Sequence, residues 1–133
     1  MPIDSLSHIT FVVRDVERTA RLWRDGLGAT EVYDSAARNY SLSREKFFVL
    51  GGVWVAVMQG ESSSRSYRHV AFHVAEKEIP EFEHRLRTLD AEIRPPRPRV
   101  EGEGLSLYFY DYDDNLLELH GGTLVERLRA YST

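Results

Sequence analysis

The sequence predicts an α+β protein built from two βαβββ repeats. Two observations lead to this fold class. Residues 6–13 read LSHITFVV and residues 67–74 read YRHVAFHV, so that His8 aligns with His69 and most of the apolar positions align as well. The order of strand-like and helix-like segments after each stretch is also the same, which makes duplication a better explanation than chance.

The first repeat, expected at about residues 5–60, starts with the β-branched and aromatic strand at residues 6–13. Asp15 stands where the N-cap of a helix is expected, before apolar residues at helical spacing: Val16, Ala20, Trp23 and Leu27. Further strands are expected at residues 30–33, 40–42, 47–50 and 53–58. The last two form a hairpin around Gly51 and Gly52.

The second repeat, expected at about residues 67–122, follows a linker at residues 60–66 that is rich in serine and charge. After its first strand we expect a helix at 76–89 and strands at 91–93, 106–110 and 116–120. Prolines make residues 94–104 a loop. A C-terminal helix is expected at about 123–131, with Leu124 and Leu128 facing inward. Residues 1–133 are therefore expected to form one domain.

Composition restricts the class of function. The 133 residues include 17 Lys and Arg against 21 Asp and Glu, a net charge of −4, which is unfavourable for general nucleic-acid binding. There is no cysteine, so a thiolate metal site or a cysteine nucleophile is excluded. No apolar run is long enough to span a bilayer and no signal peptide is evident. We therefore expect a soluble cytoplasmic protein with no membrane partner.

Three polar residues in apolar strands predict a metal site. Strand alternation turns His8 and His69 away from the core, and the repeat places them at equivalent positions. Glu118 lies in the apolar segment LLELH, where a charge is costly unless it is paired or binds a metal. Two imidazoles and one carboxylate leave open positions on Mn²⁺, Fe²⁺ or a similar ion, as Lewis-acid catalysis requires.

Each of these residues also has a simpler interpretation. A single histidine at a strand start is more often an ordinary surface or core residue than a ligand, and Glu118 would be unremarkable on a solvent-facing sheet. His120 shares the face of Glu118, so it is either a competing ligand or a partner of the ligands. Thr10 shares the face of His8, where its hydroxyl is able to donate a hydrogen bond, and Ser106 shares that of Tyr108.

Three segments resemble the vicinal-oxygen-chelate superfamily, and within it the fosfomycin-resistance proteins of the epoxide-hydrolase type. They read LSHITFVVRDVERT, YSLSREKFFVLGGVW and RPRVEGEGLSLYFYDYDDNLLELHGGTLVERL, and together they cover most of the chain. The resemblance implies Mn²⁺ as the metal and a domain-swapped homodimer. In such a dimer His8 of one chain meets His69 and Glu118 of the other.

The resemblance also implies roles for further residues. Glu45 matches the general base that activates water, although between Arg44 and Lys46 it would otherwise be taken for a solvated charge. Fosfomycin is a phosphonate that carries an epoxide. Thr10 and Ser106 are candidates for substrate binding because of their positions, and four residues match or suggest contacts in its pocket: Arg127, Tyr108, Trp54 and Arg99. The last is the weakest match, because Arg94 and Arg97 lie in the same loop.

Three other functions remain open at this point. A thiol transferase would use the same metal and phosphonate groups, with glutathione or another thiol in place of water. An Fe²⁺ extradiol dioxygenase would use the same ligands on a catechol. A drug-sequestering protein of this fold would need no metal ligands, and the presence of all three ligand residues disfavours it.

Overall fold

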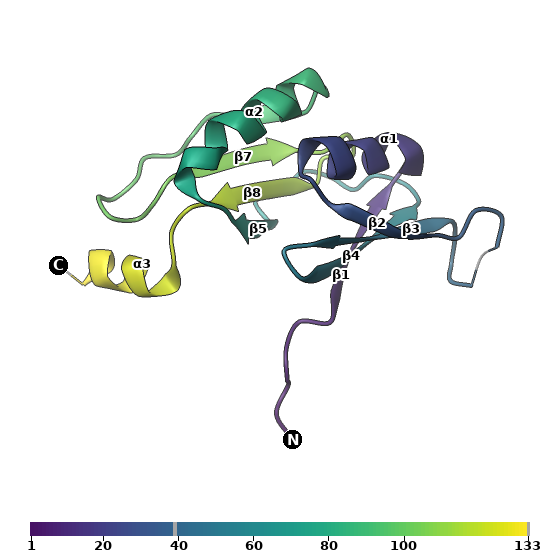
Figure 1. The fold of residues 1–133 in the computed structure, drawn as a ribbon, viewed down its shortest axis with the longest axis horizontal. Coiled ribbons are helices and arrows are strands. Elements are labelled where there is room, and N and C mark those ends of the chain that lie inside the picture. The colour runs from purple at the N-terminus through teal and green to yellow at the C-terminus, as the bar shows by residue number, and fades with distance from the viewer. Residues whose placement is uncertain (39, 133) are drawn as a thin grey trace. The chain divides into compact units, whose positions relative to one another are not determined.

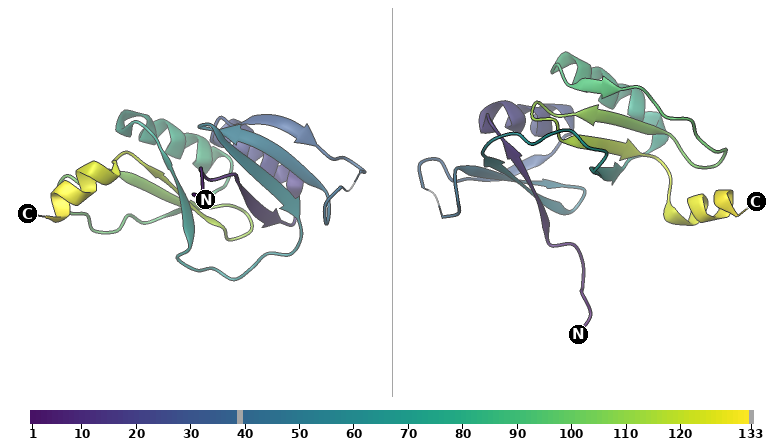
Figure 2. Two further views of the ribbon diagram at one scale, coloured as in Figure 1. Left: turned by 90° about the horizontal axis from the view of Figure 1, so that it is seen from below. Right: turned by 180° about the vertical axis from the view of Figure 1, so that it is seen from behind.

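The computed structural model describes residues 1–38 and 40–132 of the chain. Its strands and helices form two compact units, Met1–Ser64 and Arg65–Thr133. Figure 1 shows the elements of each unit in chain order, and Figure 2 shows them from two further directions. The boundary between the units lies within the linker predicted at residues 60–66.

The first unit is a four-stranded sheet with a helical segment on one face (Figure 1). Its elements are β1 (His8–Val13), α1 (Val16–Arg21), the π-helical turn η1 (Leu22–Gly26), β2 (Thr30–Asp34), β3 (Glu45–Leu50) and β4 (Val53–Gln59). The strand order is β1-β4-β3-β2, in which β1 is parallel to β4 and the other neighbours are antiparallel. Gly51 and Gly52 make the predicted hairpin turn with φ of 57° and 77°.

The second unit repeats this topology. Its elements are β5 (His69–His73), the 3₁₀ turn η2 (Glu76–Glu78), α2 (Ile79–Thr88), β6 (Glu92–Arg94), β7 (Ser106–Tyr110), β8 (Leu116–His120) and α3 (Leu124–Tyr131). The order is β5-β8-β7-β6, and β5 is again parallel to the last strand, β8. The predicted α+β fold of two βαβββ repeats is therefore confirmed.

In each unit the helix covers one face of the sheet with apolar side chains. Trp23 in η1 is fully buried, and its ring centroid lies 5.5 Å from that of Phe11 and 6.3 Å from that of Phe48. Leu86 in α2 and Leu117 in β8 are likewise fully buried in the second unit. The strands therefore turn their alternate, more polar residues to the opposite face.

The N-cap prediction is confirmed, because the Asp15 carboxylate accepts a hydrogen bond of 3.0 Å from the backbone N–H of Arg18. The strand predicted at residues 40–42 is wrong. This segment forms bends, and β2 pairs directly with β3, so that no neighbouring strand is left for it. Among the described residues, no helix has the length and apolar character needed to cross a bilayer.

The prediction that Leu124 and Leu128 face inward is also wrong. They are 71% and 59% exposed, and α3 buries none of its residues. Figures 1 and 2 show the reason: α3 projects beyond the end of β8 instead of lying across the second sheet. Its helical periodicity therefore forms an apolar stripe that this unit does not cover.

Candidate metal centre and substrate pocket

Four of the predicted site residues lie on one face of the first sheet. Residues paired across neighbouring strands point to the same side of a sheet. The register pairs His8 with Trp54 and Glu45 with Met58, and Trp54 and Met58 are an even number of residues apart in β4. Thr10 joins this face because it follows His8 by two residues in β1.

His8 and Glu45 are held differently on this face. The His8 ring lies against the Trp54 indole, with 4.2 Å between centroids, and its Nδ1 is 3.0 Å from the Ser7 hydroxyl. Glu45 is only 9% exposed. Its backbone N–H donates to the Ser35 hydroxyl and its carbonyl accepts from the Ser35 N–H, both at 3.0 Å. These two bonds fix the end of β3 that carries the carboxylate.

The two cations beside Glu45 are bound to other carboxylates. Arg44 pairs with Glu17, and the Lys46 ammonium donates to Glu31 at 3.0 Å. Burial opposes the charged form of Lys46, but the hydrogen bond to Glu31 and the surrounding carboxylates outweigh it and raise the lysine pKa. Both flanking cations are therefore paired with other carboxylates, and the low exposure of Glu45 does not fit the solvated charge that its sequence neighbourhood suggested.

The remaining strand residues of the predicted site share one face of the second sheet. The register pairs Tyr108 with Glu118 and Ser106 with His120 across β7 and β8. His69 lies on this face as well, because the residue two positions after it in β5 pairs with Glu118. The opposite face of this sheet is the apolar one that α2 covers.

His69 and Glu118 form a pair with the geometry of two ligands. His69 Nε2 lies 3.2 Å from Glu118 Oε1. Two donors that are each about 2.1 Å from one ion, at roughly 90–110° to each other, lie about 3.0–3.4 Å apart. His69 Nδ1 is 2.7 Å from the carbonyl oxygen of Tyr67. Because a carbonyl only accepts, Nδ1 carries the proton and Nε2 keeps a lone pair for a metal.

Glu118 is a buried carboxylate with several polar neighbours. Its side chain is 5% exposed, the Ser106 hydroxyl donates to Oε2 at 2.5 Å, and an Arg99 nitrogen lies 3.6 Å from the same oxygen. One carboxylate oxygen is thus engaged by the protein and the other faces His69. This donor set of imidazole nitrogen and carboxylate oxygen suits a divalent transition metal.

The three predicted ligands are divided between the two units, His8 in the first and the other two in the second. Within residues 1–38 and 40–132, no group of three His, Asp or Glu side chains is arranged to hold a metal ion. The structure therefore brings together two of the three predicted ligands.

A pocket of about 320 Å³ opens beside this pair. It is lined by His69, Ala71, Glu118, His120, Gly122, Thr123, Leu124 and Arg127. Arg127 reaches it from α3 and lies 3.1 Å from His120 Nε2. Burial lowers the pKa of His120, with Arg127 and Arg99 acting in the same direction and Glu118 against it. A guanidinium, an imidazole and a carboxylate thus line one cavity of suitable size for a small anion.

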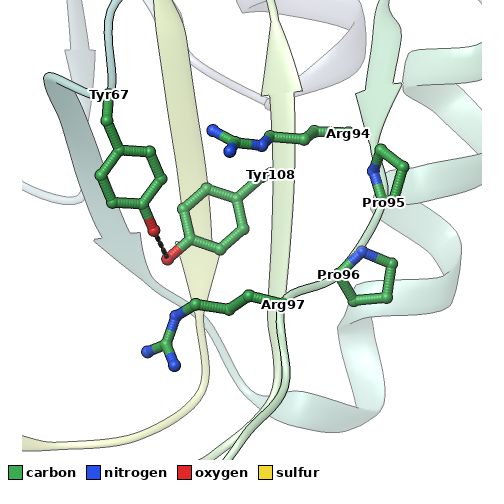
Figure 3. Close-up of a pocket in the computed structure, with 6 residues that line it drawn as sticks. All are labelled: Tyr67, Arg94, Pro95, Pro96, Arg97 and Tyr108. Atoms are coloured by element: carbon green, nitrogen blue, oxygen red, sulfur yellow. Dashed lines mark hydrogen bonds between the residues drawn. The ribbon is translucent and has the colours of Figure 1, made fainter.

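A second pocket, of about 290 Å³, lies where the proline-rich loop meets Tyr67 and Tyr108 (Figure 3). The Tyr67 hydroxyl donates to the Tyr108 hydroxyl at 3.2 Å, and the Arg94 guanidinium lies 4.9 Å from the centre of the Tyr67 ring. Burial and the bond to Tyr67 raise the pKa of Tyr108. Arg99 contacts Tyr108 at 3.5 Å, whereas Arg94 and Arg97 line this second pocket.

Glu103 is a residue that the sequence did not single out. Its side chain is fully buried, and it accepts hydrogen bonds from Arg97, from the Val100 N–H at 2.9 Å and from the Tyr131 hydroxyl at 2.7 Å. It therefore ties the loop to α3, the helix that carries Arg127. The sequence hinted at this role only by placing an acidic residue between two glycines, shortly after three arginines that are interspersed with prolines.

Acid is expected to destabilise the protein through Glu103. The hydrogen bond from Arg97, followed by those from Val100 and Tyr131, lowers the carboxyl pKa from 4.5 to about 2. A lowered pKa stabilises the fold above pH 4.5, and this contribution is lost as the pH falls toward 2. Urea unfolding midpoints measured across this range should fall less steeply for Glu103→Gln than for the wild type. Glu101→Gln, an exposed change in the same loop, should follow the wild-type slope.

Residues 5–119 match the model of the Glyoxalase/Bleomycin resistance protein/Dioxygenase superfamily. The chain is 53% identical to the fosfomycin resistance protein FosX of Mesorhizobium japonicum over 127 residues, which cover 95% of this chain and 91% of that protein. It is 33% identical to the metallothiol transferase FosB of Shouchella clausii over 135 residues, which cover 97% of this chain and 88% of that one.

A crystal structure of a FosX variant from Listeria monocytogenes, complexed with Mn(II) and 1S,2S-dihydroxypropylphosphonic acid, superposes with a TM-score of 0.89 at 43% identity. The match covers 98% of this chain and 99% of that one. Sequence and structure thus agree over nearly the whole length. The chain belongs to the Glyoxalase/Bleomycin resistance protein/Dioxygenase superfamily, and within it to the fosfomycin resistance proteins of the FosX group.

Proposed function

We propose that this protein is a Mn(II)-dependent epoxide hydrolase that adds water to fosfomycin and thereby confers resistance to it. The observation that carries the proposal is the pocket beside β8, where the His69 and Glu118 donors and the Arg127 guanidinium line one cavity. It combines a place for a divalent metal with a cation for a phosphonate, the two groups that this substrate requires.

His69 Nε2 and Glu118 would hold the metal in this unit, and the proposal adds His8 as the third ligand. A bound divalent ion supplies Lewis-acid activation of the epoxide oxygen. The choice of Mn(II) is supported by the ion in the FosX crystal structure described above. The donor set would also accept Fe²⁺, Co²⁺ or Ni²⁺, whose binding follows their availability.

The other residues bind and orient the substrate or move a proton. Arg127 offers a planar set of N–H donors that suits two phosphonate oxygens at once. Thr10 and Tyr108 add hydroxyl donors, and Trp54 adds an apolar wall. Ser106 and Arg99 act beside Glu118, where Ser106 already donates to the carboxylate. In the reaction, Glu45 removes a proton from the attacking water as the water oxygen bonds to one epoxide carbon and the bond from that carbon to the ring oxygen breaks. The ring oxygen is released as an alkoxide, which takes up a proton to give the diol.

The proposal includes a homodimer with shared sites. Each site needs His8, Thr10, Trp54 and Glu45 from the open face of a first unit, together with His69 and Glu118 from the open face of a second unit. In a domain-swapped dimer these two faces come from different protomers, so that each dimer has two sites. We also infer that the enzyme acts in the cytoplasm.

Thiol transfer is the main alternative function. The chain is more similar in sequence to FosX than to FosB, which favours hydration over thiol addition. Glu45 favours hydration as well, because a thiolate nucleophile needs no base once it is formed. A catechol substrate or simple drug sequestration gains no support from the arginine and carboxylate that we assign to the site.

Phosphorus NMR of fosfomycin incubated with the protein and Mn(II) tests the function directly. We expect the substrate resonance to be replaced by that of the diol, and we expect EDTA to prevent the change. Addition of glutathione should leave the product unchanged. A thiol adduct as the main product would assign the protein to the transferases, and binding of one equivalent of drug without turnover would make it a sequestering protein.

A further inference from the structure

We propose that His120 is a positioning residue that couples the arginine side of the pocket to its metal side through one directed chain of hydrogen bonds. This inference rests on the proposed function, because it takes Glu118 as a metal ligand and Arg127 as the phosphonate-binding cation. In this scheme His120 touches neither the metal nor the phosphonate. It hydrogen-bonds to Arg127 and Ser106, and its Nδ1 lies 3.4 Å from Glu118 Oε2.

The direction of the chain is set at Arg127. A guanidinium has only N–H donors, so His120 Nε2, at 3.1 Å from the Arg127 nitrogen, must be the acceptor. A neutral imidazole that accepts at Nε2 carries its proton at Nδ1. The arginine thus selects one tautomer of His120.

Ser106 transmits this choice to Glu118. The serine hydroxyl lies 2.6 Å from His120 Nδ1 and 2.5 Å from Glu118 Oε2. An ionised carboxylate only accepts, so the single hydroxyl proton of Ser106 is donated to Glu118. Ser106 must therefore accept from His120 Nδ1, and each donor in the series has one acceptor. The other carboxylate oxygen, Oε1, is left to face His69 at 3.2 Å.

Two glycines leave room for the His120 ring in this position. A Cβ at Gly122 would lie 2.7 Å from His120 Nε2 and 2.7 Å from the carbonyl oxygen of Glu103. A Cβ at Gly104 would lie 3.4 Å from the ring and 2.9 Å from the backbone of Gly122. The absence of side chains here lets the backbone pack closely around the imidazole, so the chain is held by packing as well as by hydrogen bonds.

The two faces of the imidazole can be tested separately. Asn in place of His120 puts an amide N–H near the position of Nδ1 and keeps the donor to Ser106. Gln reaches farther, so its amide oxygen approaches the position of Nε2 and keeps the acceptor for Arg127. His73→Ala is the matched control, because His73 is exposed and is paired with His120 in the sheet register.

Two titrations of the full-length protein measure the result: Mn(II) alone by calorimetry, and methylphosphonate with the Mn(II)-loaded protein. We expect His120→Ala to weaken both affinities, with a loss of about 10- to 100-fold for Mn(II). Asn should restore the Mn(II) affinity but not the methylphosphonate affinity, and Gln should do the reverse. His73→Ala should match the wild type in both titrations.

Ser106→Ala provides a second test that does not alter the histidine. If Arg127, His120, Ser106 and Glu118 form one series of hydrogen bonds, both substitutions interrupt that same series. The Ser106→Ala/His120→Ala double variant should then bind Mn(II) no more weakly than the more affected single variant. Additive losses would overturn the proposal. Wild-type affinities for Mn(II) and methylphosphonate in His120→Ala would also overturn it. So would equal losses of affinity in the Ala, Asn and Gln variants of His120, if these variants also melted at a lower temperature.

Neither titration requires water to be added to an epoxide. A wild-type protein that binds Mn(II) and methylphosphonate but leaves fosfomycin unchanged would contradict the proposed function. In that case the affinities for Mn(II) and methylphosphonate would still test the hydrogen-bond series through His120.

Discussion

The Glu45→Gln protein is expected to lose hydration of fosfomycin by about 10²–10⁴-fold while it still binds Mn(II) and the substrate. Glutamine keeps the size of the side chain and the backbone bonds to Ser35, so β3 should remain in place. An amide, however, has no basic oxygen that can take a proton from water at neutral pH. The loss should therefore appear in kcat, with little change in the affinity for the substrate.

Phosphorus NMR time courses give the turnover, and calorimetry gives the Mn(II) affinity of the same sample. Glu61→Gln is the matched control, since it makes the same chemical change at an exposed position of the first unit and should be as active as the wild type. Comparable turnover in Glu45→Gln would remove this residue from the mechanism.

Glu118→Ala is expected to weaken Mn(II) binding by more than about 100-fold, beyond the loss typical of a residue that only supports a ligand. The change removes the only carboxylate of the proposed ligand set, and with it most of the attraction for a divalent cation. Activity should be lost together with the metal. Titration of EDTA-treated protein with Mn(II) measures the affinity directly.

Glu118→Gln separates charge from shape. Its amide oxygen can still accept the hydrogen bond from Ser106, so the strand and its neighbours keep their arrangement while the negative charge is absent. We expect its Mn(II) affinity to fall between those of the wild type and Glu118→Ala. An affinity equal to that of the wild type in both variants would show that Glu118 is not a metal ligand. His120, which lies on the same face of the strand, would then be the next candidate for the ligand.

Strand alternation made the sheet faces of several candidate site residues predictable. The alternation of strands assigned His8 and Thr10 to a face opposite Phe11, and the register of β1 and β4 agrees with that assignment. The internal repeat then predicted an equivalent face for His69. These predictions succeeded because alternation and duplication are properties of short segments, which are readable without knowledge of their neighbours.

The sequence by itself therefore determined the repeated βαβββ fold and the faces on which the candidate ligands lie. Tertiary structure alone decided that Glu103 ties the arginine loop to α3, that α3 leaves Leu124 exposed, and that His120 lies between Arg127 and Ser106. The physical reason is that all three features depend on how separate elements are placed: two are contacts between side chains on different elements, and the exposure of Leu124 depends on where α3 lies. Whether such groups meet depends on strand register, on the path of a loop and on the direction in which a helix leaves the sheet. Local periodicity carries none of this information, whereas it carries all that is needed to place a residue on one side of a strand.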